Sequence, residues 1–501
     1  MSRQRQTNTQ PARSIVPSAG EPISYDVLVV GAGIAGINTA YRLKTQMPHL
    51  SFTVLEARDE IGGTWDLFRY PGVRSDSDMY TFGFAWHPWR RRVLGDGDEI
   101  MAYLHESVSK YGLEEYLKLG HKVVKADWTS AAQRWTVQVD HKGQPKTYAA
   151  KWLVLGPGLF EYDKPFPAVI PGIDKFKGKV FHPQHWPAGF DYTDKKVVII
   201  GSGATAITML PAMVAGGAKN VTMLQRSPSH IAAMPNPDNR PSGPGRLLPF
   251  TTLIWLRRMT WFGLMWMIHF MCAKFPGTMR RSIADNTRKQ LPAHIPLDPH
   301  FVPSYNPWDQ RLCLDKDGEF FAALRSGKAD VVTATIKTVT AGGIELDGGS
   351  TLDADIIVTA TGWILRFGGG IPISVDNKPT RWQEKLLWNK AMVQDVPNMF
   401  FMWGYTNAAW TLGVDSTATI MCRVLKHMER EGTRVVVPKT RPGSEHKTQT
   451  IWKLSSTYRL ASEPYLPKYG SDGPWKPRRH FIYDTIHARW GNVTEGLEFL
   501  S

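Results

Sequence analysis

The sequence predicts an α/β protein made of two Rossmann-like dinucleotide-binding domains with a helical insertion. Three observations support this. An apolar run, a glycine-rich turn and a helical stretch occur in this order near the N-terminus. The same order returns from residue 197, and a stretch at about 245–300, apolar over 247–272, then separates it from later strands. Repeated strand–turn–helix units of this kind build parallel sheets flanked by helices.

The first unit begins with a predicted strand over residues 24–30, because Val-Leu-Val-Val is a short, continuous apolar run. A glycine turn with the sequence GAGIAG occupies residues 31–36, and residues 37–46 have helical character. Residues 52–55 form the next predicted strand. This strand–turn–helix–strand order is that of a mononucleotide-binding unit.

The turn of the first unit is a complete GxGxxG motif. Gly31 permits the tight turn, Gly33 lets the backbone approach a pyrophosphate, and Gly36 allows close packing of helix on strand. Glu56 lies 20 residues after Gly36, where a carboxylate accepts hydrogen bonds from a ribose diol. We expect a bound dinucleotide here, and a tight turn without a ligand is the weaker alternative.

A second glycine pair follows Glu56. Residues Gly62, Gly63, Thr64 and Trp65 suit a loop that passes close to a flat cofactor. The arrangement of Glu56 followed by Gly-Gly-x-Trp resembles the FAD-binding end of flavoprotein monooxygenases. We therefore expect Gly63, Thr64 and Trp65 to contact FAD, and an ordinary loop is the alternative.

The second unit repeats the pattern with one informative difference. Its turn, GSGATA at residues 201–206, lies between predicted strands at 197–200 and 221–224, with a predicted helix over 207–214. The turn is a GxGxxA motif, which binds a pyrophosphate in the same way as the first. The residues expected at this cofactor site are Gly201, Gly203, Thr205 and Ala206.

Arg226 stands in the second unit where Glu56 stands in the first, 20 residues after the last position of the turn. A carboxylate there would repel a ribose 2′-phosphate, whereas a guanidinium binds it in a bidentate manner. Ser227 adds a hydroxyl donor. The second site is therefore expected to prefer NADPH over NADH, and an exposed surface charge is the alternative for Arg226.

Composition limits the class of protein. With 42% hydrophobic and 21% charged residues the chain is globular, and its length favours two or three domains. A net charge of +15 attracts anions in general, such as nucleotides or acidic lipid. Nucleic-acid binding is disfavoured, because the basic residues are dispersed and no recognition module occurs.

The cysteines decide against one related class of enzyme. Disulfide reductases also combine two nucleotide sites, but they need a redox cysteine pair near the flavin. The chain has only Cys272, Cys313 and Cys422, so none lies in the first unit. Electrons from the flavin are expected to pass to O₂. Neither a disulfide framework nor a metal site is expected, and a reducing, cytoplasmic location fits best.

A longer motif precedes the second unit. Phe176, Gly178, His182 and Trp186, with the proline that follows, read FxGxxxHxxxWP. The chain thereby resembles the type I Baeyer–Villiger flavin monooxygenases, whose fingerprint matches at every defined position. The likeness extends over nearly all of the chain after residue 22, and it is strongest to the subgroup of the mycobacterial ethionamide-activating monooxygenase. The segments that carry it are 62–72, 74–80, 305–313 and 404–407.

The resemblance implies a reaction and its residues. In that family NADPH reduces the flavin, O₂ binds at C4a, and the C4a-peroxyflavin attacks a ketone to give an ester or lactone. The resemblance implies that Arg311 is the cation that stabilises the negative charge and that Asp76 orients it. A structural ion pair is the alternative for Arg311, and a helix cap is the alternative for Asp76. His182 and Trp186 are expected to have structural roles in the linker.

Two qualifications accompany the resemblance. Many members have Lys-Arg at the catalytic arginine, whereas this chain has Gln310-Arg311, so discrimination against NADH is expected to be weaker. The same scaffold also serves monooxygenases of sulfur and nitrogen nucleophiles, which is the alternative function. The expected substrates are small hydrophobic ketones or thioethers. A redox-inactive flavoprotein is disfavoured, because both glycine motifs, Glu56 and Arg226 are intact.

The predicted organisation has four parts. Residues 1–22 lack an apolar h-region and are predicted to be a mobile tail, with a transit peptide as the alternative. Residues 23–165 form the first part of the FAD domain, and residues 166–350 the NADP domain with its helical insertion at about 245–300. Residues 351–501 are predicted to return to the FAD domain, beginning with a strand at 355–359.

The apolar stretch at residues 247–272 allows two interpretations. Arg257 and Arg258 interrupt it, and the apolar run after them is too short to span a bilayer. We expect a pair of amphipathic helices, mostly in the core or in a lid over an apolar pocket. Interfacial membrane contact is the alternative, because tryptophans are flanked by arginines.

Overall fold

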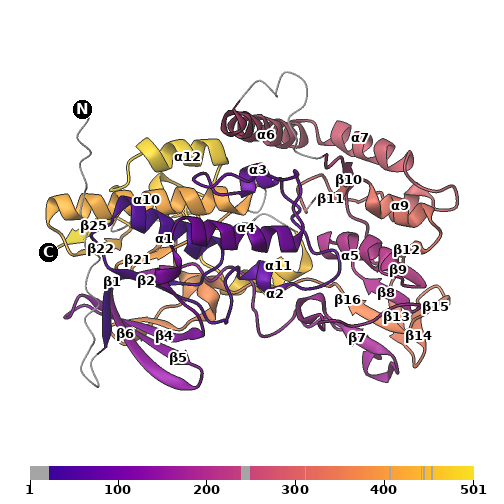
Figure 1. Ribbon diagram of the computed structural model, residues 1–501, viewed down its shortest axis with the longest axis horizontal. Helices are drawn as coiled ribbons and strands as arrows, with labels where there is room; N and C mark the ends of the chain where they lie inside the picture. Colours follow the sequence, from indigo (N-terminus) through magenta and orange to yellow (C-terminus); the bar gives the residue numbers. More distant parts are fainter. Residues whose placement is uncertain are drawn as a thin grey trace, which may run out of the picture.

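The computed structural model describes residues 22–237, 249–310, 312–405, 408–441, 443, 446–452 and 455–501. Two α/β layers lie side by side along the long axis of the molecule (Figure 1). The predicted α/β class with two Rossmann-like units and a helical insertion is confirmed. The predicted tail lies outside the described residues except for Pro22.

The first sheet has nine strands. In spatial order they are β18 (Lys378–Pro379), β17 (Ile373–Val375), β4 (His121–Thr129), β5 (Arg134–His141), β6 (Gln144–Leu155), β1 (Ile23–Val30), β2 (Phe52–Leu55) and β3 (Leu117–Lys118), with β21 (Met399–Phe401) also paired to β6. β1 pairs in parallel with β2 and β6, whereas β4, β5 and β6 form an antiparallel meander. The parallel part carries the predicted first unit.

Three long helices cover one face of this sheet: α1 (Ile34–Gln46), α4 (Gly97–Lys110) and α10 (Trp410–Glu431). Alternate β1 residues explain the layering, because Val27 and Val29 pack under the helices while Leu28 and Val30 face the opposite core. In α1 the apolar residues recur at helical spacing and are buried.

The second sheet has five parallel strands. Their order is β12 (Ala329–Thr333), β9 (Asn220–Gln225), β8 (Lys196–Ile200), β16 (Ile356–Thr359) and β7 (Lys179–Phe181). Helices α5 (Ala204–Ala215) and α9 (Glu319–Arg325) pack on one face. A small antiparallel sheet of β13 (Ile336–Val339), β14 (Gly343–Leu346) and β15 (Thr351–Asp353) packs on the other.

One predicted strand lies in the other sheet. The strand expected at 355–359 was predicted to begin the return to the first domain, but β16 pairs in parallel with β8 and β7 of the second sheet. The chain re-enters the first sheet later, with β17 and β21. A short apolar run that is buried on both faces fits either sheet, so its sequence carried no information on the choice. The domain boundaries themselves stay predictions.

The insertion contains α6 (Phe250–Lys274), α7 (Pro276–Arg288) and α8 (Leu297–His300). The expected pair of helices over 247–272 is wrong, because α6 runs unbroken through Arg257 and Arg258, and arginine is a good helix former. A position mostly in the core is wrong too, since only Ile254, Arg258 and Cys272 of α6 are buried. The expected position beside an apolar pocket is found, because four other α6 residues line the cavity described below. No helix in the described part of the chain is long and apolar enough to cross a membrane.

The remaining helices and strand pairs are short. The helices are α2 (Thr64–Leu67), α3 (Met79–Phe82), α11 (Thr457–Ser462) and α12 (Phe481–Trp490). The two-stranded pairs are β10 (Ile231–Met234) with β11 (Cys313–Lys316), β19 (Leu387–Trp388) with β20 (Met392–Val393), β22 (Val435–Pro438) with β25 (Leu497–Leu500), and β23 (Gln449–Thr450) with β24 (Lys468–Tyr469). Of these, α2, α3, α11, β10 and β11 contribute residues to the site described next.

Candidate active site

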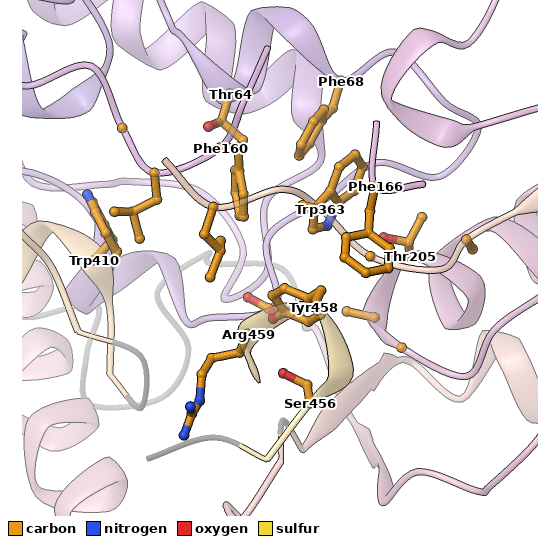
Figure 2. A pocket seen from close by; sticks show the side chains of 18 of the residues that line it. Thr64, Phe68, Phe160, Phe166, Thr205, Trp363, Trp410, Ser456, Tyr458 and Arg459 are labelled. Carbon is orange, nitrogen blue, oxygen red and sulfur yellow. The ribbon is translucent and has the colours of Figure 1, made fainter. Parts of the chain in front are cut away.

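A cavity of about 1360 Å³ lies between the two sheets. Both glycine turns open into it, as do Glu56, Arg226 and Asp76. Most of its wall is aromatic or aliphatic, and Figure 2 shows Phe68, Phe160, Trp363, Tyr458 and Trp410 gathered around it. The two predicted nucleotide sites therefore share one apolar space, at the carboxyl ends of parallel strands.

The first glycine turn has the backbone that its motif requires. Gly31 has a φ of +94°, and its N–H donates to the Leu55 carbonyl over 2.8 Å. A Cβ on Gly36 would stand 1.7 Å from the Gly31 carbonyl oxygen, so only glycine fits there. Gly33 is the N-cap of α1, so the helix has no side-chain cap, and its first turn contains no acidic residue. Its first N–H groups therefore suit an anion in the cavity.

Glu56 is buried with its carboxylate held by backbone groups. One carboxylate oxygen accepts from the Ala32 N–H over 2.6 Å, and the other accepts from the Arg58 N–H over 3.0 Å. Burial raises the pKa of Glu56, and these two hydrogen bonds oppose the shift. Each carboxylate oxygen can accept a further hydrogen bond, and Glu56 lines the cavity, so it is available to a diol there.

The glycine pair after Glu56 forms a tight passage. Gly62 and Gly63 have φ values of +101° and +56°, which side-chain-bearing residues rarely adopt. A Cβ on Gly63 would stand 3.2 Å from the Tyr162 hydroxyl, and that hydroxyl lies 3.4 Å from the Thr64 Oγ1. Burial raises the pKa of Tyr162 to about 12. Thr64 and Trp65 line the cavity directly beyond this passage.

The second glycine turn follows the first closely. Gly201 has a φ of +133°, and a Cβ there would stand 2.3 Å from the Ala360 carbonyl oxygen. α5 begins at Gly203 without a side-chain cap, and a Cβ on Gly203 would meet no atom within 4 Å, so the cavity is open there. Thr205 lines the cavity. Ala206 is fully buried in the core beneath the turn, where it packs the helix onto the sheet.

Arg226 and Ser227 follow β9 at the rim of the cavity. Both side chains are exposed to solvent. The Ser227 carbonyl accepts from the Ser202 hydroxyl over 2.9 Å, which ties this rim to the glycine turn. A guanidinium in this place is accessible to a phosphate that enters the cavity along α5.

Of the two predicted catalytic residues, Asp76 and Arg311, the structure describes only Asp76. Asp76 lines the cavity. The alternative role of helix cap belongs to Asp78 instead, whose carboxylate accepts from the Thr81 N–H over 2.8 Å at the start of α3. Arg311 lies outside the described residues. Its chain neighbours Gln310 and Leu312 both line the cavity that contains Asp76.

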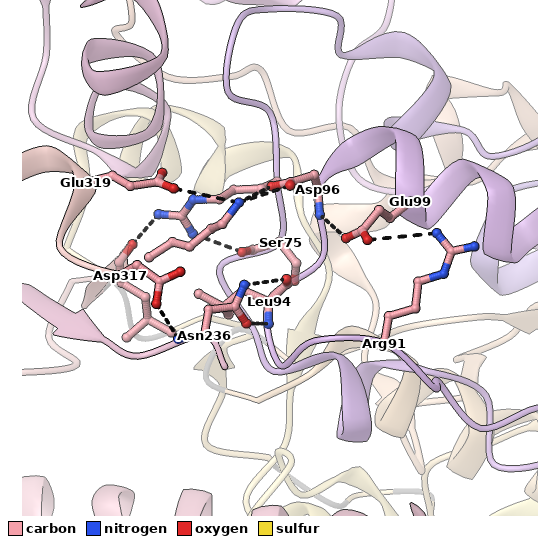
Figure 3. Close-up of polar contacts among 11 residues, drawn as sticks. Ser75, Arg91, Leu94, Asp96, Glu99, Asn236, Asp317 and Glu319 are labelled. Atoms are coloured by element: carbon pink, nitrogen blue, oxygen red, sulfur yellow. Dashed lines mark hydrogen bonds and ion pairs between the residues drawn. The ribbon is translucent and has the colours of Figure 1, made fainter. Parts of the chain in front are cut away.

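The segment after residue 311 is attached to the loop that carries Asp76 (Figure 3). Arg74 donates to the Leu314 carbonyl over 2.5 Å. Lys316 pairs with Asp96, with its Nζ 3.0 Å from both carboxylate oxygens. These contacts join β11 of the second layer to the loop before α4 of the first.

Asn236, two residues after β10, strengthens the same junction. Its side chain accepts from the Leu94 N–H over 2.8 Å and donates to the Leu94 carbonyl over 3.1 Å. Its own N–H donates to Asp317 over 2.7 Å. We call the set Arg74, Asp96, Asn236, Lys316 and Asp317 the interlayer latch. The latch holds the loop of residues 74–96 against the segments around β10 and β11, and both sides contribute residues to the cavity.

The fingerprint residues attach the linker to the second sheet. The His182 Nδ1 accepts from the Gln184 N–H over 3.2 Å, and its Nε2 lies 3.1 Å from the Gly362 carbonyl oxygen. Burial lowers the pKa of His182 to about 4, so the ring is neutral and Nε2 carries the proton. Trp186 is buried against Phe181, with ring centroids 5.4 Å apart.

The glycine and phenylalanine of the fingerprint have packing roles in the same linker. A Cβ on Gly178 would stand 2.3 Å from the Asp355 carbonyl oxygen and 2.6 Å from the Phe176 ring. Phe176 packs against the core between the second sheet and the β13–β15 sheet. These contacts explain why the motif specifies a glycine two residues after an aromatic ring.

Sequence reasoning missed most of the aromatic wall. Trp363 stacks on Phe68 with ring centroids 4.4 Å apart, and Tyr458 enters from α11. Trp308 lies three residues before Arg311 with a φ of +75°. Trp363 had a usable signal, because it follows the carboxyl end of a parallel strand, where ligands bind. Tyr458 and Tyr162 had none.

Comparisons with known proteins identify the family. The family model described as pyridine nucleotide-disulphide oxidoreductase matches residues 25–237. The chain is 42% identical over 477 residues to the probable FAD-binding monooxygenase AlmA of an Acinetobacter species, covering 95% of this chain and 96% of that protein. It is 41% identical over 483 residues to the FAD-containing monooxygenase EthA of Mycobacterium tuberculosis, covering 95% and 97%.

Solved structures show the same fold. Cyclohexanone monooxygenase from Rhodococcus sp. Phi1, bound to NADP⁺, superposes with a TM-score of 0.73 at 21% identity, covering 96% of this chain and all of that one. A steroid monooxygenase bound to NADP gives a TM-score of 0.73 at 20% identity, covering 95% and 99%. The matching model is named for disulphide oxidoreductases, but this chain has no disulfide among its cysteines: all three are buried thiols. With more than 40% identity over almost its whole length to AlmA and EthA, the chain belongs to the family of FAD-containing monooxygenases.

Proposed function

We propose that this monooxygenase uses FAD, NADPH and O₂ to convert hydrophobic ketones into esters or lactones. The observation that carries the proposal is that both nucleotide motifs, Asp76 and the two neighbours of Arg311 open into one apolar cavity. In the balanced reaction, ketone, O₂, NADPH and one proton give ester, NADP⁺ and water. One oxygen atom enters the C–C bond beside the carbonyl, and NADPH supplies the two electrons that reduce the other to water.

The residues around the first turn fit FAD. The uncapped start of α1 and the bare Gly33 suit the pyrophosphate, and Glu56 suits the ribose diol. Gly63, Thr64 and Trp65 would adjoin the flavin end. When bound, FAD supplies the redox chemistry, because it accepts a hydride from NADPH and passes electrons to O₂.

The residues around the second turn fit NADPH. The open space at Gly203 and the uncapped start of α5 suit its pyrophosphate. Arg226 and Ser227, which line the same cavity, would bind the 2′-phosphate. The other expected contacts are those of Gly201 and Thr205. Structures of the same fold that contain FAD and NADP support this pairing of cofactors.

The chain's own contribution to the reaction is electrostatic. The reaction develops negative charge on oxygen, and a fixed cation in a cavity with few polar groups stabilises such charge more strongly than water does. We assign this role to Arg311, and we assign to Asp76 the role of orienting it. The aromatic side chains of the wall would limit access of water to the reacting oxygen.

Oxygenation of sulfur or nitrogen is the second candidate function. An apolar cavity of this size admits thioethers as readily as ketones, and the family name does not distinguish between them. The fingerprint of residues 176–187 favours ketones. The two functions give different products, since ketones yield esters and thioethers yield sulfoxides.

Replacement of Arg311 by alanine tests the assignment. We expect the Arg311→Ala variant to bind FAD and to reduce it with NADPH at a rate within about threefold of wild type, because Arg311 belongs to neither glycine motif. Ester formation should fall by roughly 100-fold or more, as expected for loss of a preorganised charge, with NADPH oxidation diverted to hydrogen peroxide. Stopped-flow absorbance near 450 nm and product chromatography measure the two steps.

The matched control is Arg381→Ala, which removes an exposed arginine paired with Glu384. That variant should equal wild type in both steps. A normal ester yield from Arg311→Ala would overturn the assigned role.

A further inference from the structure

We propose that α6, together with α7 and α12, seats this enzyme on an anionic membrane surface and that apolar substrates pass from the lipid into the cavity beside α6. The binding part of this inference stands by itself. The entry part rests on the proposed function and names its substrates as ketones that dissolve in lipid.

The first observation is a concentration of exposed apolar side chains. Of the twenty large hydrophobic residues that are exposed in the described part of the chain, thirteen lie within residues 250–275 or on α12. On α6, residues 255, 259, 266 and 270 follow one another at helical spacing and form an outward stripe. Single exposed apolar residues are ordinary, whereas an apolar stripe on this scale marks an interaction surface.

The exposed helices form one edge of the molecule. α12, α6 and α7 succeed one another along the top of Figure 1. α6 packs against α12 through Phe262 and Phe481, whose ring centroids lie 5.3 Å apart. The exposed large apolar residues of α12 extend this surface; they are Ile482, Tyr483, Ile486 and Trp490. We call this combined surface the α6 face.

The charges around the α6 face point to an anionic partner. Residues 249–290 contain seven arginines and lysines, of which Arg258 is buried, and a single acid, Asp285, which pairs with Arg288. Lys274, Arg281 and Lys289 are exposed beside the apolar stripe. On α12, Arg489 is exposed while the only acid, Asp484, is buried. Apolar and tryptophan-rich helices flanked by bases bind anionic bilayers.

The same charges argue against a second copy of the chain as the occupant. Two α6 faces brought together would place like charges opposite one another around an apolar centre, which opposes association. An anionic lipid surface neutralises those charges and accepts the apolar side chains in the same contact. Tryptophan and tyrosine, which supply four of the thirteen exposed residues, favour the boundary between headgroup and acyl chain.

The opposite side of α6 belongs to the cavity. Trp261, Leu264, Met265 and Ile268 line it. Leu264 is also 42% exposed, so it reaches both the solvent surface and the cavity. One helix therefore separates the α6 face from the site, and that helix is apolar on both sides. A hydrophobic ketone in the membrane would have a path along Leu264 that exposes it little to water.

Vesicle sedimentation tests the binding without any substrate. The FAD-loaded wild-type protein is mixed with phosphatidylcholine vesicles, with or without phosphatidylglycerol. We expect partition into the anionic vesicles to exceed partition into the neutral ones by about 10-fold or more, and to weaken with added salt. The double variant Trp266→Glu/Phe270→Glu, outside the cavity, should lower binding by roughly 10-fold or more. The matched control Val124→Glu, an exposed valine on β4, should bind like wild type.

Three results would overturn the binding proposal. Wild-type protein could stay in the supernatant with both kinds of vesicle. The double variant and Val124→Glu could bind equally well. Size-exclusion chromatography could show that the double variant changes a dimer into a monomer while wild type ignores vesicles, which would make the α6 face an interface between copies.

Turnover tests the entry step separately. With anionic vesicles present, a long-chain methyl ketone should react at least about 10-fold faster with wild type than with Trp266→Glu/Phe270→Glu, because the substrate is dissolved in the lipid. Acetophenone, which is available from water, should react equally with both proteins. Equal rates on the long-chain ketone would contradict the entry step, and no ester from any ketone would contradict the proposed function while leaving the vesicle result valid.

Discussion

Glu56 and Arg226 occupy the same position in two repeated units, and their different environments fit different tasks. Glu56 is buried and held by the N–H groups of Ala32 and Arg58, so its carboxylate has one fixed direction. Arg226 is exposed at the rim, where a long side chain can follow a mobile phosphate. A count of 20 residues from each glycine turn leads to the residue directly after β2 or β9, because the turn, helix and next strand have nearly the same length in the two units.

The substitution Arg226→Ala tests the assignment of the second site. We expect the KM for NADPH to rise by roughly 10-fold or more, since a bidentate contact to a phosphate is lost, while the KM for NADH changes little. Initial rates of flavin reduction with each nucleotide give the comparison. Lys195→Ala, an exposed cation of the same domain, serves as the control and should leave both constants unchanged. Equal increases in the KM for NADPH and in the KM for NADH would show that Arg226 does not bind the 2′-phosphate.

Other site residues could not be predicted from the sequence, for a physical reason. Tyr162 meets Gly63 and Thr64 from about 100 positions later, and Tyr458 meets Gly362 across a similar distance along the chain. Neither tyrosine belongs to a local pattern, so only the folded chain brings them to the cavity. Asp76 and Asp78 also could not be separated beforehand, because either could have capped the short helix that α3 forms.

At the scale of elements, the interlayer latch connects the second layer to the loop of Asp76. Lys316 is only 13% exposed, so its pair with Asp96 is less screened than an ordinary surface pair. β11 follows Arg311 directly and carries Lys316. The latch therefore holds the segment that begins at Leu312 against the first layer.

The substitution Lys316→Ala should weaken the attachment of β11 to the first layer, because it removes the pair with Asp96. We expect ester formed per NADPH consumed to fall by about two- to tenfold, with normal flavin reduction, because positioning changes at the reacting end alone. The comparison variant is Lys337→Ala, which breaks a more exposed lysine pair with Glu345, 2.7 Å long, and should keep full coupling. Unchanged coupling in Lys316→Ala would mean that the latch has no part in positioning.

Elements were predicted unevenly, and the reasons are physical. Strands and helices of the two repeated units were found, because apolar runs flanked by glycine turns leave few other arrangements. β16 was assigned to the wrong sheet, since a four-residue apolar run has no feature that selects its neighbour. α6 was divided in two because Arg257 and Arg258 looked like an interruption, yet Arg258 is buried and donates to the carbonyls of Tyr80 and Gly83.

At the scale of the whole molecule, stability should depend on pH through buried neutral histidines. Burial lowers the pKa of His182 to about 4, whereas an unfolded histidine titrates near 6.5. Between these values the unfolded chain binds a proton that the folded chain excludes. The free energy of unfolding therefore decreases as the pH falls from about 6.5 towards 4, by roughly 3 kcal/mol from this residue.

The His182→Gln variant isolates that effect. A glutamine amide can donate to the Gly362 carbonyl and accept from the Gln184 N–H, but it does not titrate. The melting temperature of the variant should decrease less than that of wild type between about pH 7 and pH 5. Other histidines with lowered pKa, such as His230 and His269, are present in both proteins and cancel in the comparison. An equal decrease in melting temperature for the variant and the wild type over this pH range would contradict the role of His182.

The central claim concerns the whole molecule, because two cofactor sites and the Asp76 and Arg311 segments have to act in one cavity. Its most direct test is a reaction of the purified protein with NADPH, ¹⁸O₂, an aryl ketone and a thioether, followed by mass spectrometry. We predict an ester that carries one ¹⁸O atom and forms in step with NADPH consumption. Labelled sulfoxide without ester would contradict the ketone reaction, and hydrogen peroxide as the sole oxygen product would contradict monooxygenation of either substrate.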